Sequence, residues 1–360
     1  MDETLAMMQA LTEAPGVPGH ERAVRDLMRG YLAPYGEVLT DGLGGIVARR
    51  TGAGGAEEPR ILLAGHMDEV GYMVTLIDEN GYLKFQPLGG WWEQVMLAQR
   101  VLVRTHKGDL VGVVGSKPPH VLTAEERQKM TEKKAMFIDI GVTSRQDAIE
   151  AGVRPGDPII PICPFTPMAN PKVLLAKAWD NRAGCALAVE TLRLLAADGG
   201  AHPNTVYAGA TVQEEVGLRG AATLAGLVQP HVGIAYDVGI AGDTPGTAPH
   251  EAQSKLGAGA ILFIFDGSLI PNLRLRDLAI ETAEAGGIPY QFDTVAMGGE
   301  DAGRWAMHGS GVPAICIGVP ARYIHSAASI IHWDDFQAAA QLGAALIRRL
   351  DAATVATLRD

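Results

Sequence analysis

Apolar and polar residues follow two different patterns along the chain, and the pattern changes at about residues 72 and 163. Outside that interval, short apolar runs of strand length alternate with longer segments of helical periodicity. Strands are expected at 46–50, 61–64, 173–176, 205–212, 231–239, 257–266 and 312–320, and helices at 3–13, 21–33, 181–197, 271–286 and 335–350. This alternation of strand and helix predicts an α/β fold.

Between residues 72 and 163 the runs are shorter, and hairpin signals separate them. Asn80-Gly81 lies between TLIDE and YLKF, and Lys107-Gly108-Asp109 lies between VLVRT and LVGVVG. We therefore expect a small all-β unit, a compact barrel, inserted into the α/β part. Half of residues 121–134 are charged, so a solvated loop or a short helix is expected there.

Composition narrows the class of protein. The 360 residues are 47% apolar and 20% charged, which is ordinary for a soluble globular enzyme. A net charge of −11 disfavours binding to nucleic acid. The cysteines are too few and too scattered for a disulfide framework. No apolar stretch approaches a membrane span and MDETLAMM has no basic region, so we expect a cytoplasmic protein.

Side chains able to bind a metal ion follow five of the apolar runs. They are His66, Asp180, Glu215, Asp237 and His325. In an open α/β sheet, functional groups collect beyond the carboxyl ends of the strands, so these five residues are expected to meet at one edge. Each also has a simpler explanation, since Asp180 could cap a helix and His66 could lie in a solvated turn.

Two histidines and three carboxylates, one of them bridging, would hold two zinc-like ions and leave room for water. Glu214 is adjacent to Glu215, and their side chains diverge, so Glu214 is free to take a proton from water. Asp68 is placed to align His66, because ligating histidines usually have a second hydrogen-bond partner. Paired ions of this kind typically serve hydrolysis.

Five motifs in this order, GHMDEVG, AWDNRAG, QEEVGLRGA, YDVG and RYIHS, closely resemble the tetrahedral (TET) aminopeptidase family. These dinuclear-metal exopeptidases include deblocking and glutamyl aminopeptidases. The resemblance covers nearly the whole chain and includes LGGW, GSKPPH and FIDIG in the all-β unit. It implies a three-layer α/β/α catalytic domain with a mixed sheet, at residues 1–69 plus 164–360. A small PDZ-like barrel at residues 70–163 would interrupt that domain and serve dimerisation.

The resemblance also implies a function. The enzyme would remove N-terminal amino acids from peptides, using two divalent ions per subunit, Zn²⁺ or Co²⁺, within a homo-oligomer, a tetrahedral dodecamer built from dimers. His66 and Asp237 would hold one ion, Glu215 and His325 the other, and Asp180 would bridge them. Glu214 would be the general base, and Asp68 would orient His66.

The chain departs from the family pattern at three places. Asp180-Asn181 stands where relatives often have two aspartates, and GGED (298–301) stands where Gly-Gly-Thr-Asp is common. Ala258 and Ala260 stand where relatives often carry Lys and Pro. Both of the latter segments are expected to border the substrate pocket. Glu300 could therefore favour a basic residue at P1, bind the substrate ammonium, or be a solvated surface acid.

Three other functions fit parts of the pattern. An N-acyl amino-acid deacylase or a carboxypeptidase would use the same metal site on a different substrate. A glycosidase would need two carboxyl groups about 5–9.5 Å apart across a glycosidic bond, which the adjacent Glu214 and Glu215 do not easily provide. A scaffold with structural metal ions would need no general base beside its ligands.

Overall fold

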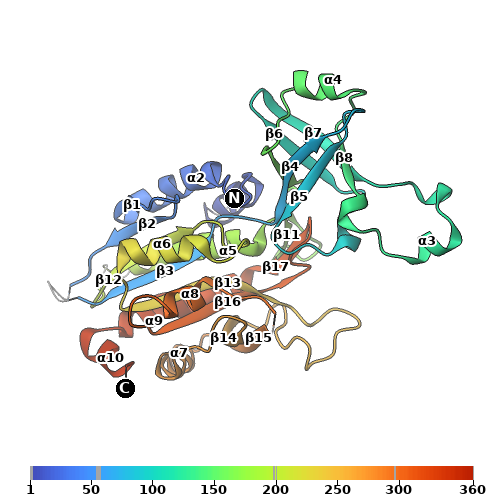
Figure 1. The fold of residues 1–360 in the computed structure, drawn as a ribbon. Coiled ribbons are helices and arrows are strands. Elements are labelled where there is room, and N and C mark those ends of the chain that lie inside the picture. Colours follow the sequence, from blue (N-terminus) through green and yellow to red (C-terminus); the bar gives the residue numbers. More distant parts are fainter. Residues whose placement is uncertain (1–2, 54–57, 198, 200, 296, 360) are drawn as a thin grey trace.

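The structure is a computed structural model that describes residues 3–53, 58–197, 199, 201–295 and 297–359. The chain forms two parts, an α/β part built on a large sheet and an all-β barrel beside it (Figure 1). The helices are α1 (Glu3–Glu13), α2 (Arg22–Leu32), α3 (Ala124–Gln128), α4 (Arg145–Glu150), α5 (Trp179–Ala197), α6 (Arg219–Val228), α7 (Leu273–Gly286), α8 (Asp301–Ala306), α9 (Trp333–Arg349) and α10 (Ala352–Thr357).

The sheet of the α/β part has eleven strands among the described residues. They are β1 (Glu37–Thr40), β2 (Ile46–Arg50), β3 (Arg60–His66), β10 (Thr166–Pro167), β11 (Val173–Ala176), β12 (Thr205–Thr211), β13 (Val232–Ile240), β14 (Ala260–Asp266), β15 (Tyr290–Val295), β16 (Ala314–Arg322) and β17 (Ser329–His332). At the centre, β12, β3, β13 and β16 are parallel neighbours, and antiparallel strands flank them. The sheet is therefore mixed, and its parallel strands deliver their carboxyl ends to one edge.

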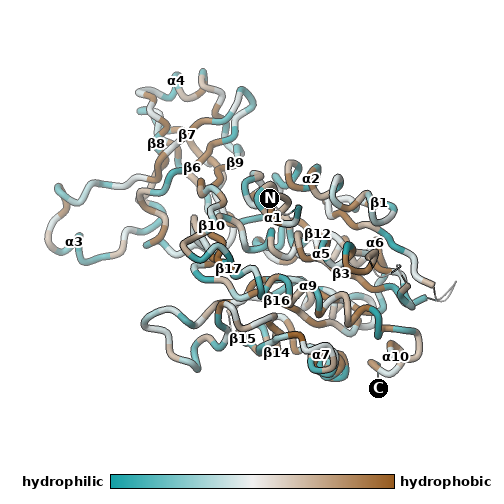
Figure 2. Tube along the Cα trace, turned by 180° about the vertical axis from the view of Figure 1, so that it is seen from behind, coloured by the Kyte–Doolittle hydropathy of each residue, from teal (hydrophilic) through white to brown (hydrophobic). Residues whose placement is uncertain are grey.

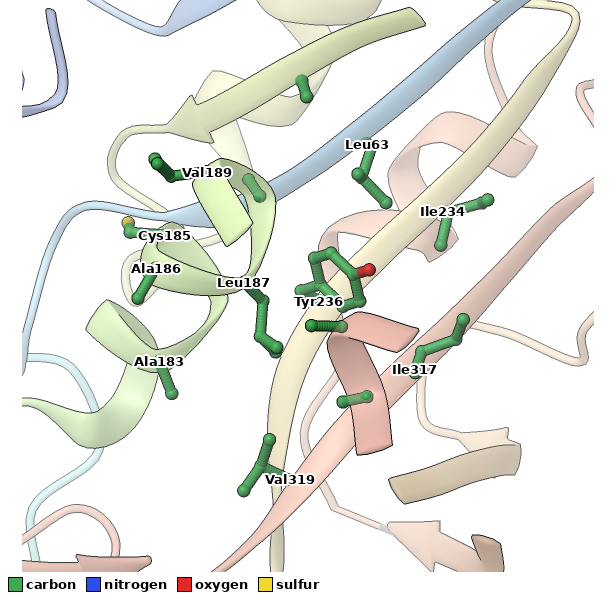
Figure 3. Packing of buried hydrophobic residues seen from close by; sticks show 14 of the residues in the cluster. Leu63, Ala183, Cys185, Ala186, Leu187, Val189, Ile234, Tyr236, Ile317 and Val319 are labelled. Carbon is green, nitrogen blue, oxygen red and sulfur yellow. The ribbon is translucent and has the colours of Figure 1, made fainter. Parts of the chain in front are cut away.

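Alternate residues of the central strands face opposite sides of this sheet. Ile61 and Leu63 of β3 belong to the apolar cluster formed with α1, α2, α5, α7 and α9. Leu62 and Ala64 belong to the cluster formed with α6 and α8. Figure 3 shows the first cluster from close by, with Leu63 and Tyr236 of the sheet beside α5. Both faces of the sheet are covered, which makes the expected three-layer α/β/α arrangement.

The all-β part is a closed barrel with the strand order β4-β5-β8-β7-β6-β9. Its strands are β4 (Gly71–Ile77), β5 (Leu83–Leu88), β6 (Arg100–Thr105), β7 (Gly108–Gly115), β8 (Phe137–Asp139) and β9 (Pro158–Pro161). The two expected hairpins join β4 to β5 and β6 to β7. The segment around α3 extends away from the barrel and is largely hydrophilic (Figure 2). The prediction of a solvated short helix in this segment is confirmed.

The predicted fold class is confirmed, with a few local differences. The elements not predicted from the sequence include β1, β10, β15, β17, α4, α6, α8 and α10. The sequence analysis also placed Asp237 at the end of a strand, which is wrong, because β13 continues to Ile240. The domain boundaries at residues 70 and 163 stay a prediction, with the barrel strands running from Gly71 to Pro161. Among the described residues, no helix has the length and apolar character needed to span a bilayer.

Candidate metal centre

The residues predicted to bind metal come together beyond the carboxyl ends of the parallel strands. His66 is the last residue of β3, Glu214 and Glu215 follow β12, and His325 follows β16. Asp180 follows β11 at the start of α5, and Asp237 reaches the same place from inside β13. Two groups of side chains have possible ligand atoms within 4.8 Å of one another. These groups are His66, Glu214 and Asp237, and His66, Asp180 and Glu215.

Asp180 lies between the two histidines and faces both. Its Oδ1 is 3.1 Å from Nε2 of His66, and its Oδ2 is 3.3 Å from Nε2 of His325. Nε2 of His325 is also 3.6 Å from Oε2 of Glu215. One carboxylate that faces two imidazoles through different oxygens has the arrangement of a bridging ligand.

The carboxylates of Glu214 and Asp237 also lie near Nε2 of His66. Nε2 of His66 is 3.8 Å from Oε2 of Glu214 and 3.9 Å from Oδ2 of Asp237. Glu214 therefore lies directly beside the position at which His66 and Asp237 would meet an ion.

Asn181, rather than Asp180, supplies the capping hydrogen bond at the start of α5. Its Oδ1 accepts a hydrogen bond from the backbone N–H of Gly184 at 2.8 Å. Its Nδ2 donates to the backbone carbonyl of Tyr236 at 2.7 Å, next to Asp237. The interpretation of Asp180 as a helix cap is therefore wrong, and its carboxylate is free to face the two histidines.

Asp68 contacts three of the functional residues. Its backbone carbonyl lies 3.1 Å from Nδ1 of His66, and its Oδ1 lies 3.5 Å from the same nitrogen. Its two carboxylate oxygens accept hydrogen bonds from the backbone N–H groups of Glu214 and Glu215, each at 3.0 Å. The fully buried Asp68 thus fixes the turn that carries both glutamates as well as lying beside His66.

The barrel part also reaches the site, through the LGGW motif. The backbone carbonyl of Gly90 accepts a hydrogen bond from Nδ1 of His325 at 2.7 Å. A Cβ atom on Gly89 would lie 2.8 Å from Oε2 of Glu215, and one on Gly90 would lie 3.0 Å from Nδ1 of His325. Glycine is required at both positions because the backbone passes so close to these side chains.

Comparison with known proteins identifies the family. The model of the M42 glutamyl aminopeptidase family matches residues 44–342, and a second model, AMPT, matches residues 2–28. The chain belongs to the M42 aminopeptidase family.

Two relatives show how far the similarity to M42 aminopeptidases extends. A glutamyl aminopeptidase of Lactococcus lactis is 37% identical, over 99% of each chain. A solved TET aminopeptidase from Thaumarchaeota archaeon SCGC AB-539-E09 is 47% identical and superimposes with a TM-score of 0.96, over 99% of each chain.

A third similarity concerns assembly. A TET1 peptidase of Pyrococcus horikoshii, described as able to assemble into a tetrahedron or a large octahedral shell, is 30% identical with a TM-score of 0.85. The match covers 96% of the present chain and all of that one. The resemblance to the TET family is confirmed, and the chain is a metal-dependent aminopeptidase rather than a deacylase or a carboxypeptidase.

The buried charges of this M42 site shift the pKa of its side chains. Burial raises the pKa of Glu214 well above its ordinary value and that of Glu215 to about 8, and it also raises the pKa of Asp237. Burial acts on Asp180 in the same direction, but hydrogen bonds from His325 and His66 outweigh it and lower its pKa. Lys and Arg are absent from the described ion pairs of these four carboxylates, so no permanent cation in those pairs opposes the effect of burial.

These residues fit two divalent cations. Asp180, Glu214, Glu215 and Asp237 carry four negative charges when ionised, and two divalent ions carry four positive charges. Oε1 of Glu215 is buried without a hydrogen-bond partner among the described residues, as expected for an atom reserved for a ligand. Carboxylate and imidazole donors are also the set that zinc and cobalt accept.

A cavity of about 850 Å³ opens onto this centre. Trp92, which is 56% exposed, and Glu300 are among its lining residues. Glu300 is only 7% exposed, and burial together with the neighbouring carboxylate of Asp237 raises its pKa. The interpretation of Glu300 as a solvated surface acid is therefore wrong.

Sequence reasoning missed other residues around the site. Asp301 is buried, and its Oδ2 accepts a 2.5 Å hydrogen bond from the hydroxyl of Thr211, at the end of β12. Lys177 and Arg182 both contact Glu69, directly after Asp68. A charged residue inside an otherwise apolar stretch, as Lys177 is in KVLLAKAW, is the sequence signal that could have indicated a buried ion pair.

Proposed function

We propose that this M42 aminopeptidase removes single amino acids from the amino terminus of peptides with two divalent ions per subunit. His66 and Asp237 would hold one ion, Glu215 and His325 the other, and Asp180 would bridge them. Zn²⁺ and Co²⁺ are the ions we expect. The observation that carries the proposal is the position of Asp180, whose two oxygens face His66 and His325 separately at 3.1 and 3.3 Å.

The ions would supply Lewis acidity and lower the pKa of a bound water molecule. Glu214 would accept a proton from the attacking water and donate it to the leaving amine. Its position 3.8 Å from Nε2 of His66, beside the expected ligands, supports this role. Asp68 holds Glu214 in place through its backbone N–H and orients His66.

We further propose the division into a catalytic domain, residues 1–69 plus 164–360, and an inserted barrel, residues 70–163, that serves dimerisation. Leu76, Val111 and Val113 of the barrel are large apolar residues with exposed side chains, which supports a contact surface. The solved TET1 relative that can assemble into a tetrahedron supports a tetrahedral assembly, which we propose is a dodecamer built from such dimers. A cytoplasmic location is part of the proposal and fits the free thiols of Cys163, Cys185 and Cys316.

The test is hydrolysis of a panel of aminoacyl and N-acetylaminoacyl fluorogenic substrates. The protein is treated with EDTA, and zinc or cobalt is then returned at known stoichiometry. We expect cleavage of the free-amine substrates alone, lost with EDTA and restored in full only at two ions per subunit. Full activity at one ion per subunit, or cleavage of the acetylated substrates, would contradict the proposal.

A further inference from the structure

Glu300 is an acidic side chain of the active-site cavity that the proposed metal centre does not use. It lies in the turn before α8, and its carboxyl group lies beside that of Asp237. It is one of five acidic residues among the described residues that line the cavity, and that lining contains neither Lys nor Arg. The two proposed divalent ions would balance four of the five, which leaves Glu300 without a positive partner in this lining.

Two further buried acids near Glu300 add to this excess of negative charge. Asp301, the next residue, is 2% exposed, and its Oδ1 has no hydrogen-bond partner among the described residues. Asp266, at the end of β14, is 1% exposed and also has an unpartnered oxygen, Oδ2. A buried carboxylate is costly unless a cation or a full set of donors accompanies it. A cation from outside the chain that reaches Glu300 would offset part of this negative charge.

The backbone fixes the position of Glu300. The hydroxyl of Ser268 donates to Oδ1 of Asp266 at 2.7 Å and lies 3.3 Å from the backbone carbonyl of Glu300. A Cβ atom on Gly299 or Gly303 would clash with Ser268, so the two turns pack directly against each other. The backbone that carries Glu300 is therefore positioned before any ligand binds, which lowers the entropic cost of binding.

The walls of the cavity beside Glu300 are apolar. Val238, Ile240, Val295 and Ile324 are among the lining residues. An aliphatic chain can contact these side chains while a charged nitrogen reaches the carboxylate. An N-terminal lysine has such a chain, and every free peptide also carries a positively charged α-amino group.

We propose that Glu300 binds a positively charged nitrogen of the substrate and selects for it. The proposal rests on the proposed aminopeptidase function, and it names an organic ammonium group as the ligand. The nitrogen is either the α-ammonium of the peptide or the side chain of a basic P1 residue. A glutamyl substrate would bring another carboxylate beside Glu300, so it is a poor substrate in either case.

The first measurement separates the two sources in the metal-loaded enzyme. Lysyl and norleucyl fluorogenic substrates share an aliphatic chain, and only lysine carries the terminal charge. The ratio of their kcat/KM values reports on the P1 side chain. Leucine hydroxamate and 4-methylpentanoic hydroxamate differ only in the α-ammonium, and the ratio of their Kd values by calorimetry reports on that group.

The variant is Glu300→Gln, which keeps the shape of the side chain and removes its charge. We expect one of the two ratios to fall at least tenfold, and the ratio that falls identifies the nitrogen. Glu300→Thr removes the same charge with a smaller side chain and gives the same answer if the glutamine variant folds poorly. The matched control is Asp293→Asn, since Asp293 is 1% exposed but does not line the cavity. In this control, both ratios should stay within about twofold of their wild-type values.

If both ratios stay unchanged in variants that still bind two metal ions, the proposal is overturned, even if turnover falls. Failure of the aminopeptidase function itself is a different result, because the wild-type enzyme would then cleave no free-amine substrate. The calorimetric ratio needs no turnover, so it still tests Glu300 in that case.

Discussion

His66 and Glu69 are three residues apart, yet they belong to two buried clusters with different charge balance. The metal-edge cluster consists of His66, Asp180, Glu214, Glu215, Asp237 and His325. Its carboxylates have only the two histidines as possible cationic partners among the described residues. The Glu69 cluster consists of Glu69, Lys177 and Arg182, in which one carboxylate meets two cations.

The Glu69 cluster is satisfied within the chain. Arg182 has five N–H groups and makes five hydrogen bonds. They go to the backbone carbonyls of Met67, Leu11, Ala14 and Gly16 and to Oε1 of Glu69. Lys177 donates to both oxygens of Glu69, at 2.6 and 2.8 Å. A cluster with its hydrogen bonds complete has a structural role, whereas the incomplete metal-edge cluster is arranged for ligands.

The largest effect on the metal-edge cluster should come from Glu214→Gln. The change keeps the shape of the side chain but removes the general base, so kcat should fall by ~10²–10⁴-fold. Metal content and unfolding temperature should change little, because Glu214 is not among the expected ligands. Steady-state kinetics together with metal analysis of the same sample provide the measurement.

The matched control is Glu251→Gln, which changes an exposed acid outside the cavity lining. Its kcat should equal that of the wild type. A near-normal kcat in Glu214→Gln would show that the base has been assigned to the wrong residue.

Breaking the Glu69 cluster should instead damage the fold. Arg182→Met removes the five hydrogen bonds that the fully buried Arg182 donates to four carbonyl groups and one carboxylate oxygen. Removing one partner of a buried ionic network typically costs about 3–5 kcal/mol of unfolding free energy. Chemical denaturation monitored by circular dichroism would measure the loss.

Arg276→Met is the control, because Arg276 is partly exposed and pairs with its exposed neighbour Asp277. It should cost less than about 1 kcal/mol. If Arg182→Met were as stable as this control, the satisfied cluster would have no structural role.

Asp68 connects the two clusters, since it precedes Glu69 and holds the turn of Glu214 and Glu215. In Asp68→Asn, an NH2 group replaces one carboxylate oxygen, and this group cannot accept the second backbone hydrogen bond. We expect kcat to fall ~10–100-fold, as for other residues that position metal ligands. Metal affinity should weaken together with kcat, which the Glu214 variant should not show. Titration of the apoenzyme with zinc separates the two outcomes.

Most of the fold follows from local patterns in the sequence. Buried parallel strands such as β3 and β13 are continuous apolar runs, and the barrel hairpins carry Asn-Gly and Lys-Gly-Asp turns. The missed elements are short or lack such signals. The strand β1 (EVLT) has exposed or half-buried residues, and α8 has six residues, of which the first lies in an acidic turn. Their formation depends on packing against the rest of the sheet.

The expected metal ligands could be predicted from the sequence, but the hydrogen bonds that hold them in place could not. His66, Asp180 and Glu215 each follow an apolar run, which local patterns reveal. The hydrogen bond from His325 to the carbonyl of Gly90 joins residues 235 positions apart. Backbone carbonyls carry no sequence signal, so contacts of this kind emerge only from the folded chain. The hydrogen bond by which Asn181 caps α5 could not be predicted either, because the side chain of the adjacent Asp180 also has an acceptor oxygen suited to a helix cap.

The smallest expected effect is a pH-dependent change in the free energy of unfolding. It comes from Lys177 of the Glu69 cluster, which has one more positive charge than negative. Burial lowers the pKa of Lys177 from 10.5 to about 8, although Glu69 acts in the opposite direction. Between these two pH values the unfolded chain keeps a proton that the folded protein releases, so stability rises with pH. Relative to Lys177→Met, the wild type should gain ~2 kcal/mol between pH 8 and 10.5.

Urea unfolding of both proteins at intervals from pH 7 to 10.5 provides the measurement. Lys172→Met is the control, because Lys172 is an exposed lysine paired with Asp334, and its difference from the wild type should not vary over this range. A wild-type advantage that shrinks as the pH rises would mean that Glu69 outweighs burial and raises the pKa of Lys177. In that case the excess positive charge of the Glu69 cluster would not destabilise the folded protein. The excess negative charge of the metal-edge cluster, by contrast, has no such compensation within the described chain.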